Sequence, residues 1–379
     1  MSLFSTFIND KKCMNKTRII LLLFFFSFKL LYSQESFFKK GLELFDDEQF
    51  ILAQSYFEKI NTDQALFYNA ECSKILFLDD AEFLYEKLLF DYPESILNHN
   101  ANIALAEINF RKKKYMKSIR YFSNELNDLN DSQIFNLAYS YFASDSLVKS
   151  KLFFKKLLNS SNSCAAAAQY YYAHIAYQNK DFISSLEWFL KLEGKTKFSD
   201  IIPYYIAQIY YQKKEYKKLI LFLESKVDNI ITSRTTEVNR LLAESYYHLE
   251  NYDRAIKYFN LYFSNNNSFV KQEYYMLAFS YFKSLDNVNA IKFFEKSLGQ
   301  NDTLDQISSY YLGASYLKMN NKKYSLNAFK KSSQFNINLS LKDDALFNYA
   351  KLSYELDLPY NNTLEIFKKF INESNSQPK

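Results

Sequence analysis

Residues 171–189 read YYAHIAYQNKDFISSLEWF. The stretch places a small residue at Ala173, a second small residue twelve positions later at Ser185, and an aromatic residue four positions after that at Phe189. A polar turn, QNKD, separates the two halves. The stretch therefore predicts two short helices joined by a turn.

The same trio of two small residues and one aromatic residue recurs along the chain. Its first small residues lie about 34 positions apart, and the chain holds ten copies. Six further copies keep the same intervals: Gly41/Ala53/Phe57, Ala106/Ser118/Phe122, Ala138/Ser150/Phe154, Ala243/Ala255/Phe259, Ala278/Ala290/Phe294 and Gly313/Ser325/Phe329. Looser copies are Ala70/Ala81/Tyr85, Ala207/Leu219/Leu223 and Ala350/Thr363/Phe367.

Each residue of the trio has a physical role in this interpretation. In residues 241–263, Ala243 and Tyr246 share one helical face, and Ala255 and Phe259 share a face of the second helix. Two antiparallel helices approach closely only where a side chain is small, which predicts a close contact at the small positions. The aromatic residue of the turn, Tyr252 in this copy, is expected to cap the helix pair from outside.

A 34-residue period with two helices per unit resembles the tetratricopeptide repeat family over about residues 35–371. The resemblance implies an all-α, right-handed superhelical solenoid of about ten helix-turn-helix repeats. Segments such as DAEFLYEKLLFDYPES (80–95) and IIPYYIAQIYYQKKEY (201–216) also look like the amino-terminal part of the long exported tetratricopeptide proteins of Bacteroidetes-type bacteria.

The composition agrees with a helical array. The chain has 379 residues but only four glycines and four prolines, where an ordinary chain holds about 7% Gly and about 5% Pro. Turn-rich β architectures and glycine-loop nucleotide sites are therefore excluded. Of the formal net charge of +5, residues 1–33 hold +4, and no concentrated basic face follows, so nucleic acid is not an expected partner.

The amino-terminal segment has the layout of a secretory signal peptide. Lys16 and Arg18 precede a ten-residue apolar stretch, residues 19–28, which Lys29 interrupts well short of the roughly 20 apolar residues that span a bilayer. We predict a signal peptide over residues 1–33, with Met14 as an alternative start and Gln34 as the first mature residue. Retention as an uncleaved anchor is the alternative, and would be the only membrane contact.

The predicted domain organisation follows from the leader and the repeats. A solenoid is expected over residues 34–371, followed by a flexible polar tail over residues 372–379. The leader predicts an exported protein that lies in the periplasm. Association with the outer membrane is an alternative within this prediction.

Candidate binding residues come from the family resemblance. In that family the first helix of each repeat lines the concave side, with exposed positions three before, one after and four after the first small residue. Carried over, these positions are Phe135, Tyr139, Phe142, Tyr170, His174, Tyr177, Tyr204, Gln208, Tyr211, Arg240, Glu244, Tyr247, Tyr275, Phe279 and Phe282. Tyrosine suits a peptide-binding surface because it offers apolar area with a polar tip. The alternative is that these aromatics reflect overall composition and pack between neighbouring helices.

The sequence offers no enzyme motif. It contains no GxGxxG, GxxxxGK[ST], GxSxG or HExxH, and the acidic pairs Asp79/Asp80 and Asp343/Asp344 are predicted to lie on solvent faces. Cys72 and Cys164 are expected to be small buried residues, with neither a disulfide nor a metal site, and no cofactor is predicted. Lys and Asn of the family's carboxylate-gripping clamp are absent, since Tyr, His and Gln stand in their places.

Two functions from different classes remain. The first is a non-enzymatic envelope scaffold that binds proteins or extended peptides on an aromatic concave face. The second is a structural protein that holds glycan or peptidoglycan in the cell envelope.

Overall fold

The computed structural model describes residues 34–194, 197–198, 200–224, 226, 232–264, 269–356 and 363–373. The predicted signal peptide, residues 1–33, lies outside this part of the chain, as does most of the predicted polar tail. The last helix, Thr363–Glu373, extends two residues into that predicted tail.

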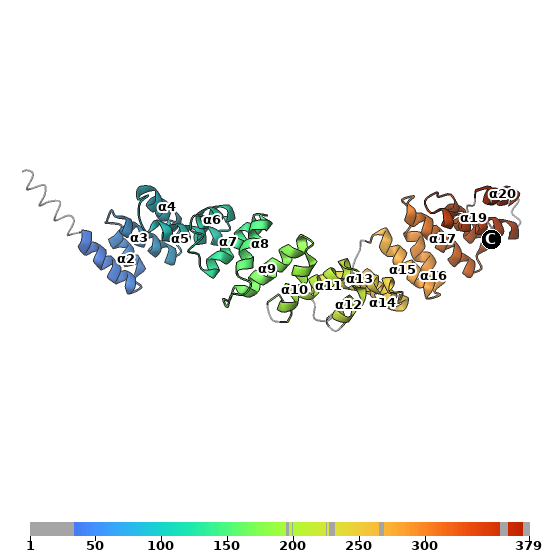
Figure 1. The fold of residues 1–379 in the computed structure, drawn as a ribbon, viewed down its shortest axis with the longest axis horizontal. Coiled ribbons are helices and arrows are strands. Elements are labelled where there is room, and N and C mark those ends of the chain that lie inside the picture. The colour runs from blue at the N-terminus through green and yellow to red at the C-terminus, as the bar shows by residue number, and fades with distance from the viewer. Residues whose placement is uncertain are drawn as a thin grey trace, which may run out of the picture. The chain divides into compact units, whose positions relative to one another are not determined.

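All regular secondary structure in the described residues is helical, and successive helices are joined by short turns (Figure 1). Helical residues 34–46 come first. The helices that follow are α2 (Phe50–Phe57), α3 (Asp63–Ile75), α4 (Ala81–Asp91), α5 (Asn98–Arg111), α6 (Tyr115–Phe122), α7 (Asp131–Ala143), α8 (Leu147–Lys156), α9 (Ala165–Gln178), α10 (Phe182–Leu192), α11 (Ile202–Gln212), α12 (Tyr216–Leu223), α13 (Thr232–His248), α14 (Tyr252–Ser264), α15 (Lys271–Lys283), α16 (Asn287–Lys296), α17 (Thr303–Lys318), α18 (Lys322–Ser333), α19 (Leu339–Glu355) and α20 (Thr363–Glu373). The predicted all-α array of helix pairs is confirmed.

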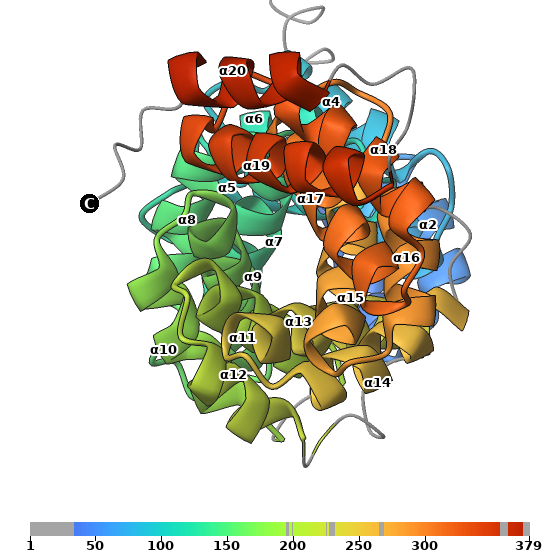
Figure 2. The same ribbon diagram turned by 90° about the vertical axis from the view of Figure 1, so that its right-hand side faces the viewer.

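The chain divides into two compact units. Unit 1 comprises residues 1–176 and unit 2 comprises residues 177–379, so the boundary falls within α9. In unit 1 the helix pairs run from α2 to α8, and in unit 2 they continue to α20, which lies along α19 (Figure 2).

The turns inside the first nine repeats, which the structure describes, have one recurring backbone geometry. A residue seven positions after the first small residue adopts a left-handed conformation, with φ between 55° and 65°. The residues are Glu48, Phe77, Lys113, Asp145, Lys180, Lys214, Glu250, Leu285 and Asn320. The next amide closes the helix end, as when Lys114 N donates to Asn109 O at 2.8 Å. These nine described turns therefore share one helix-ending motif, and in none of them is the left-handed residue a glycine.

The small residues make the close helix contacts that the sequence predicts. A Cβ atom placed on Gly41 would lie 2.6 Å from the Phe57 ring, so only glycine fits there without movement. Ser150 Oγ donates to Ala138 O at 2.9 Å, which joins the two small positions of one repeat directly. Ser150 and the Phe57 ring are both fully buried, as the sequence interpretation predicts for close contacts between paired helices.

Four of the described junctions between adjacent repeats have a stacking contact that the sequence interpretation missed. There the residue two positions before the first small residue is a tyrosine, and its ring stacks on the buried aromatic of the preceding repeat. Within unit 1, Tyr171 stacks on Phe154 with centroids 5.4 Å apart and an interplanar angle of 13°. Within unit 2, Tyr205 stacks on Phe189 at 5.1 Å and 7°. These rings fix the packing of one repeat on the next.

Candidate functional site

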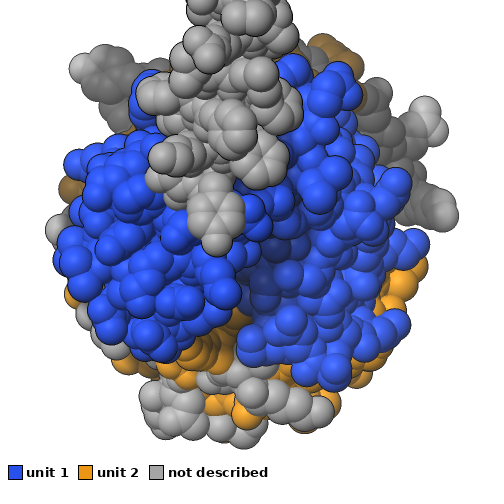
Figure 3. Space-filling model, turned by 90° about the vertical axis from the view of Figure 1, so that its left-hand side faces the viewer, with its two compact units in different colours: residues 1–176 blue, residues 177–379 orange. Residues whose placement is uncertain are grey.

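The first helices of unit 1 leave a cavity between them. It has a volume of about 450 Å³ and is lined mainly by α3, by α5 and by residues close to them. The lining residues include Phe67, Glu71 and Lys74 of α3 and Ile103 and Glu107 of α5. They occupy the positions three before, one after or four after the first small residue, which we call the groove face. The space-filling surface of unit 1, blue in Figure 3, is hollowed near its middle.

The cavity holds two carboxylates with different partners. Glu71 pairs with Lys74, whose Nζ lies 2.6 Å from Oε2, and it accepts a hydrogen bond from the Tyr85 hydroxyl at 2.5 Å. Burial, followed by the Glu71 carboxylate, raises the pKa of Tyr85 far above its usual value, so the hydroxyl stays a donor. Glu107 accepts a hydrogen bond from Gln133 Nε2 at 3.1 Å. The signal for these residues was present in the sequence, because the same offsets applied to the second and third repeats select them.

Seven rings form a first aromatic cluster in unit 1. The Tyr171 ring is central, since its centroid lies 5.3 Å from that of Tyr139 and 5.1 Å from that of Phe142. Burial raises the pKa of Tyr171 to about 12, so its hydroxyl is neutral. The cluster comprises Phe110, Tyr115, Phe135, Tyr139, Phe142, Phe154 and Tyr171.

A second aromatic cluster in unit 2 uses the same seven repeat positions, four repeats later. Its central ring is Tyr311, whose centroid lies 4.9 Å from that of Phe279 and 5.3 Å from that of Phe282. Burial raises the pKa of Tyr247 to about 12. The cluster comprises Tyr247, Tyr252, Tyr275, Phe279, Phe282, Phe294 and Tyr311.

The turn aromatics belong to these clusters, which corrects one prediction. Tyr252 was expected to cap its helix pair from outside, but its ring lies 6.3 Å from Tyr247 and 5.9 Å from Phe279, both groove-face residues. Tyr115 contacts Phe110 at 6.1 Å in the corresponding way. The physical reason is that the first residue of the second helix lies beside the last turn of the first helix.

The predicted residues at the end of unit 1 form a ring pair. Tyr170 stacks on His174 at 6.0 Å, and Phe142 contacts the same imidazole at 5.9 Å. Burial lowers the pKa of His174, so the imidazole is neutral. The imidazole therefore packs against one ring of α7 and one ring of α9.

Several predicted residues of unit 2 are engaged with one another. Gln208 and Glu244 are 8% and 6% exposed, where the prediction had them facing solvent. Arg240 Nη1 donates to Glu244 Oε1 at 2.8 Å, and the Tyr211 hydroxyl donates to the same carboxylate. These contacts explain the burial, because the carboxylate has two donors in place of water.

Tyr177 and Tyr204, two further predicted residues, also have defined neighbours within unit 2. The Tyr177 ring lies 5.4 Å from that of Tyr205, and the Tyr204 hydroxyl accepts a hydrogen bond from Gln208 Nε2 at 3.1 Å. The Arg234 guanidinium lies over the Tyr204 ring at 5.0 Å. The groove face of unit 2 is thus a mixed aromatic and polar surface.

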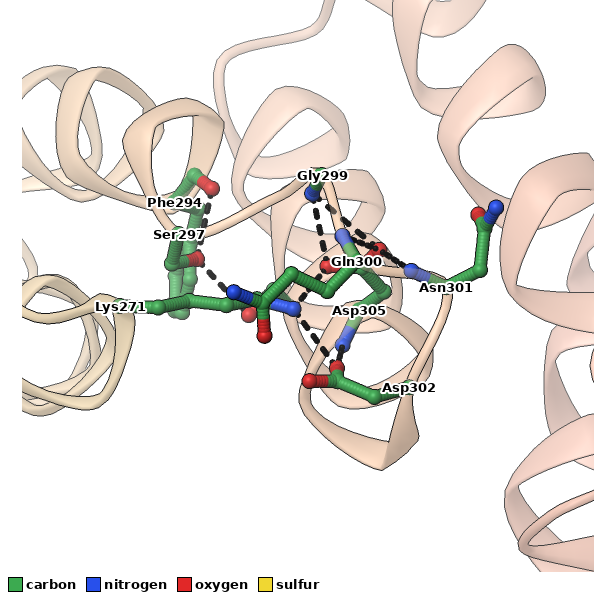
Figure 4. Close-up of polar contacts among 9 residues, drawn as sticks. Lys271, Phe294, Ser297, Gly299, Gln300, Asn301, Asp302 and Asp305 are labelled. Carbon is green, nitrogen blue, oxygen red and sulfur yellow. Dashed lines mark hydrogen bonds and ion pairs between the residues drawn. The ribbon is translucent and has the colours of Figure 1, made fainter.

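A buried polar cluster between α15 and α17 is structural (Figure 4). The Asp305 carboxylate is fully buried and accepts backbone N–H groups from Gly299 at 3.0 Å and Asn301 at 2.6 Å. Lys271 Nζ lies 2.5 Å from Asp305 Oδ1 and 2.6 Å from Asp302 Oδ1. Burial pushes the Asp305 pKa up, but Lys271 and the amides hold it below its usual value. The charged groups of this cluster pair with one another and with backbone N–H groups, and these contacts fix the loop before α17.

The remaining reactive side chains do not converge. Cys72 is a buried free thiol as predicted, whereas Cys164 is partly exposed, because it lies in the turn before α9 with its Sγ 3.8 Å from Asp131 O. Asp343, predicted to face solvent, is buried within α19 at 7% exposure. Within the described ranges, no group of three or more His, Cys, Asp or Glu side chains could hold a metal ion.

The geometry identifies the repeat type. A 34-residue period, paired helices, a left-handed residue in the turn between them and small residues contacting a buried aromatic recur through both units. The fold is a helix-pair array of the tetratricopeptide type.

No family model matches this chain, and no curated protein sequence matches it. Several solved structures are similar to it at low sequence identity. YrrB, described as a TPR protein with an unusual peptide-binding site, is 16% identical over 51% of this chain and 95% of its own, with a TM-score of 0.41. The Naa15/Naa10 complex bound to HypK-THB is 12% identical over 89% of this chain and 58% of its own, with a TM-score of 0.47. The P58(IPK) TPR domain is 13% identical over 86% of this chain and 99% of its own, with a TM-score of 0.30.

Among the residues that the structure describes, no helix combines the length and the apolar character needed to cross a bilayer.

Proposed function

We propose that this chain is a non-enzymatic interaction scaffold of the cell envelope, periplasmic after export, whose groove face binds extended segments of protein partners. Tetratricopeptide arrays present continuous surfaces built from successive first helices, which suits extended ligands. The proposed location rests on the leader sequence in residues 1–33.

One observation carries the proposal. The groove face of unit 1 combines a cavity of about 450 Å³ with an adjoining cluster of half-buried aromatic rings. Both features include residues of α5, since Glu107 lines the cavity and Phe110 belongs to the first aromatic cluster. Half-buried aromatic rings beside a polar cavity offer apolar contact area and hydrogen-bonding groups to the same ligand.

A capture experiment tests the proposal. Tyr170→Ser and Tyr204→Ser, one variant in each unit, remove groove-face rings, and we expect each to lose protein partners that the unmodified chain captures from envelope extracts. The matched controls are Val148→Ser and Ile183→Ser, which remove second-helix side chains that are 83% and 81% exposed. Circular dichroism confirms that all four variants remain helical.

The outcomes separate the two candidate functions. Loss of discrete protein partners in the groove variants alone supports the scaffold. Equal loss in groove and control variants contradicts a groove site. Sedimentation with purified cell wall, without protein partners, would favour the structural or glycan-associated function instead.

A further inference from the structure

The charges of the unit 1 cavity do not balance. Its lining includes two carboxylates, Glu71 and Glu107, and one ammonium, Lys74. The Lys74 ammonium lies 2.6 Å from Glu71, so that pair is neutral overall. Glu107 accepts a hydrogen bond from the Gln133 side-chain amide, which carries no charge. None of the residues that line the cavity therefore supplies a cation to pair with the Glu107 carboxylate. A cation entering the cavity would complete a second ion pair.

The walls of the cavity favour a long side chain over a small hydrated ion. Phe45, Phe67, Tyr68 and Ile103 supply apolar and aromatic surface around the two carboxylates. The Phe45 and Tyr68 rings pack edge to face with centroids 5.3 Å apart, which gives one wall a fixed position. Lysine and arginine side chains match such a site, because their apolar stems pack on rings while the charged end reaches a carboxylate.

The first aromatic cluster begins one helical turn along α5 from the cavity. Phe110 lies three residues after Glu107 on the same face of α5, and its ring lies 5.9 Å from Tyr139 on α7. Neighbouring packed helices are about 8–10 Å apart, which an extended chain covers in about three residues at roughly 3.3 Å each. A ligand that uses both features is therefore elongated.

We infer that the unit 1 cavity binds the lysine or arginine side chain of an extended peptide, with an apolar residue about three positions away on the first aromatic cluster. The inference rests on the proposed scaffold function and names its ligand chemistry. The Glu107 carboxylate selects a basic ligand residue over a neutral or acidic one. The rings of the first aromatic cluster supply apolar contact that discriminates less between ligand residues.

Three pools of ten-residue fluorescent peptides test the inference on the full chain. All carry Phe three positions from a central residue that is fixed as lysine, acetyl-lysine or glutamate, with Ala, Ser, Gly and Thr mixed elsewhere. We expect fluorescence anisotropy to show about tenfold tighter binding of the lysine pool than of the acetyl-lysine pool, which has a similar shape without the charge. The glutamate pool should bind most weakly, and added salt should narrow the differences.

Variants of the chain locate the effect. Glu107→Gln should bring the lysine pool down to the affinity of the acetyl-lysine pool and leave the latter unchanged. Glu107→Lys should reverse the preference, so that the glutamate pool binds best. The control Glu94→Gln removes an exposed charge of unit 1 outside the cavity lining and should change nothing.

The result distinguishes this inference from the proposed function. Equal binding of the lysine and acetyl-lysine pools, or an unchanged preference in Glu107→Lys, overturns the cation site while leaving groove binding intact. Binding of no pool also overturns it. Failure of the proposed function is read separately, from groove variants Tyr170→Ser and Tyr204→Ser that still capture every partner.

Discussion

Two junctions within unit 1 hold neighbouring repeats together by different means. Between the second and third repeats, the Glu82 carboxylate of α4 lies 3.0 Å from Lys112 Nζ and 3.2 Å from Lys117 Nζ. Between the fourth and fifth repeats, Tyr171 packs against rings of the preceding repeat, including Phe154. The first junction is an ion-pair network beside an open cavity, and the second is a closed stack of rings.

The difference shows that one repeat geometry supports two uses of the groove face. At the ring junction, the groove-face side chains Tyr139 and Phe142 contact the next repeat through Tyr171. At the ion-pair junction, the equivalent side chains are Glu71 and Lys74, which line the cavity together with Glu107. Replacing a groove-face side chain should therefore cost more stability at the ring junction, where the rings also offer apolar contact to a ligand, than at the ion-pair junction.

The largest expected effect is on the ring junction. Tyr171→Ala should lower the free energy of unfolding by about 3 kcal/mol, because it removes a half-buried ring that contacts several others. Urea denaturation followed by circular dichroism measures the change. The matched variant in the open region, Glu107→Ala, should stay within about 0.5 kcal/mol of the unmodified chain. Similar decreases in the free energy of unfolding of Tyr171→Ala and Glu107→Ala would contradict the proposed difference between the two junctions.

A smaller effect is expected at the ion-pair junction. Burial raises the pKa of Glu82, but Lys112 and Lys117 outweigh it and hold the pKa at about 2, below the ordinary 4.5. The stabilisation is therefore fully present above pH 4.5 and is lost as the pH falls toward about 2. Because water screens the half-exposed lysines, we expect Glu82→Gln to lower the free energy of unfolding by about 1 kcal/mol at neutral pH.

Measuring both proteins across the pH range sharpens this prediction. The difference between Glu82→Gln and the unmodified chain should shrink as the pH falls toward 2 and should also shrink in high salt. The ring variant Tyr171→Ala should show neither dependence. A salt-independent loss in Glu82→Gln would mean that packing, and not charge, joins the second and third repeats.

The smallest effect concerns a feature that the two regions share. Lys113 and Asp145 occupy the same turn position and have φ values of 57° and 58°. Glycine relieves the left-handed strain but gains entropy in the unfolded chain, so Lys113→Gly should stabilise by about 0.5 kcal/mol. Asp145→Gly should give less, because aspartate tolerates this conformation better. Thermal unfolding measures both, and destabilisation by either variant would contradict the shared-turn description.

The repeat architecture could be predicted from the sequence because small residues are costly to replace at close contacts. Gly41 and Gly313 each lie against a buried phenylalanine, and that requirement is visible as a fixed interval in the sequence. The groove-face offsets are also readable from the sequence, but the predicted site covers five repeats and leaves out those that contain Glu71 and Glu107.

Other features depended on contacts between repeats that the intervals do not show. Tyr171 and Tyr311 stand next to predicted groove residues, but only the packing shows that they stack on the preceding repeat. A recurring aromatic two positions before the small residue was the available signal. The burial of Glu244 depends on how Arg240 and Tyr211 orient, which spacing alone does not determine.

The most direct test of the central claim is to find which face of the repeats a partner touches. A benzophenone-bearing phenylalanine analogue placed at Ile103 or Tyr170 on the groove face, or at Val148 on a second helix, crosslinks to whatever lies against it. With envelope extract, we predict discrete protein adducts at Ile103 and Tyr170 and none at the 83%-exposed Val148. Adducts at Val148 with none at the two groove-face positions would contradict the account.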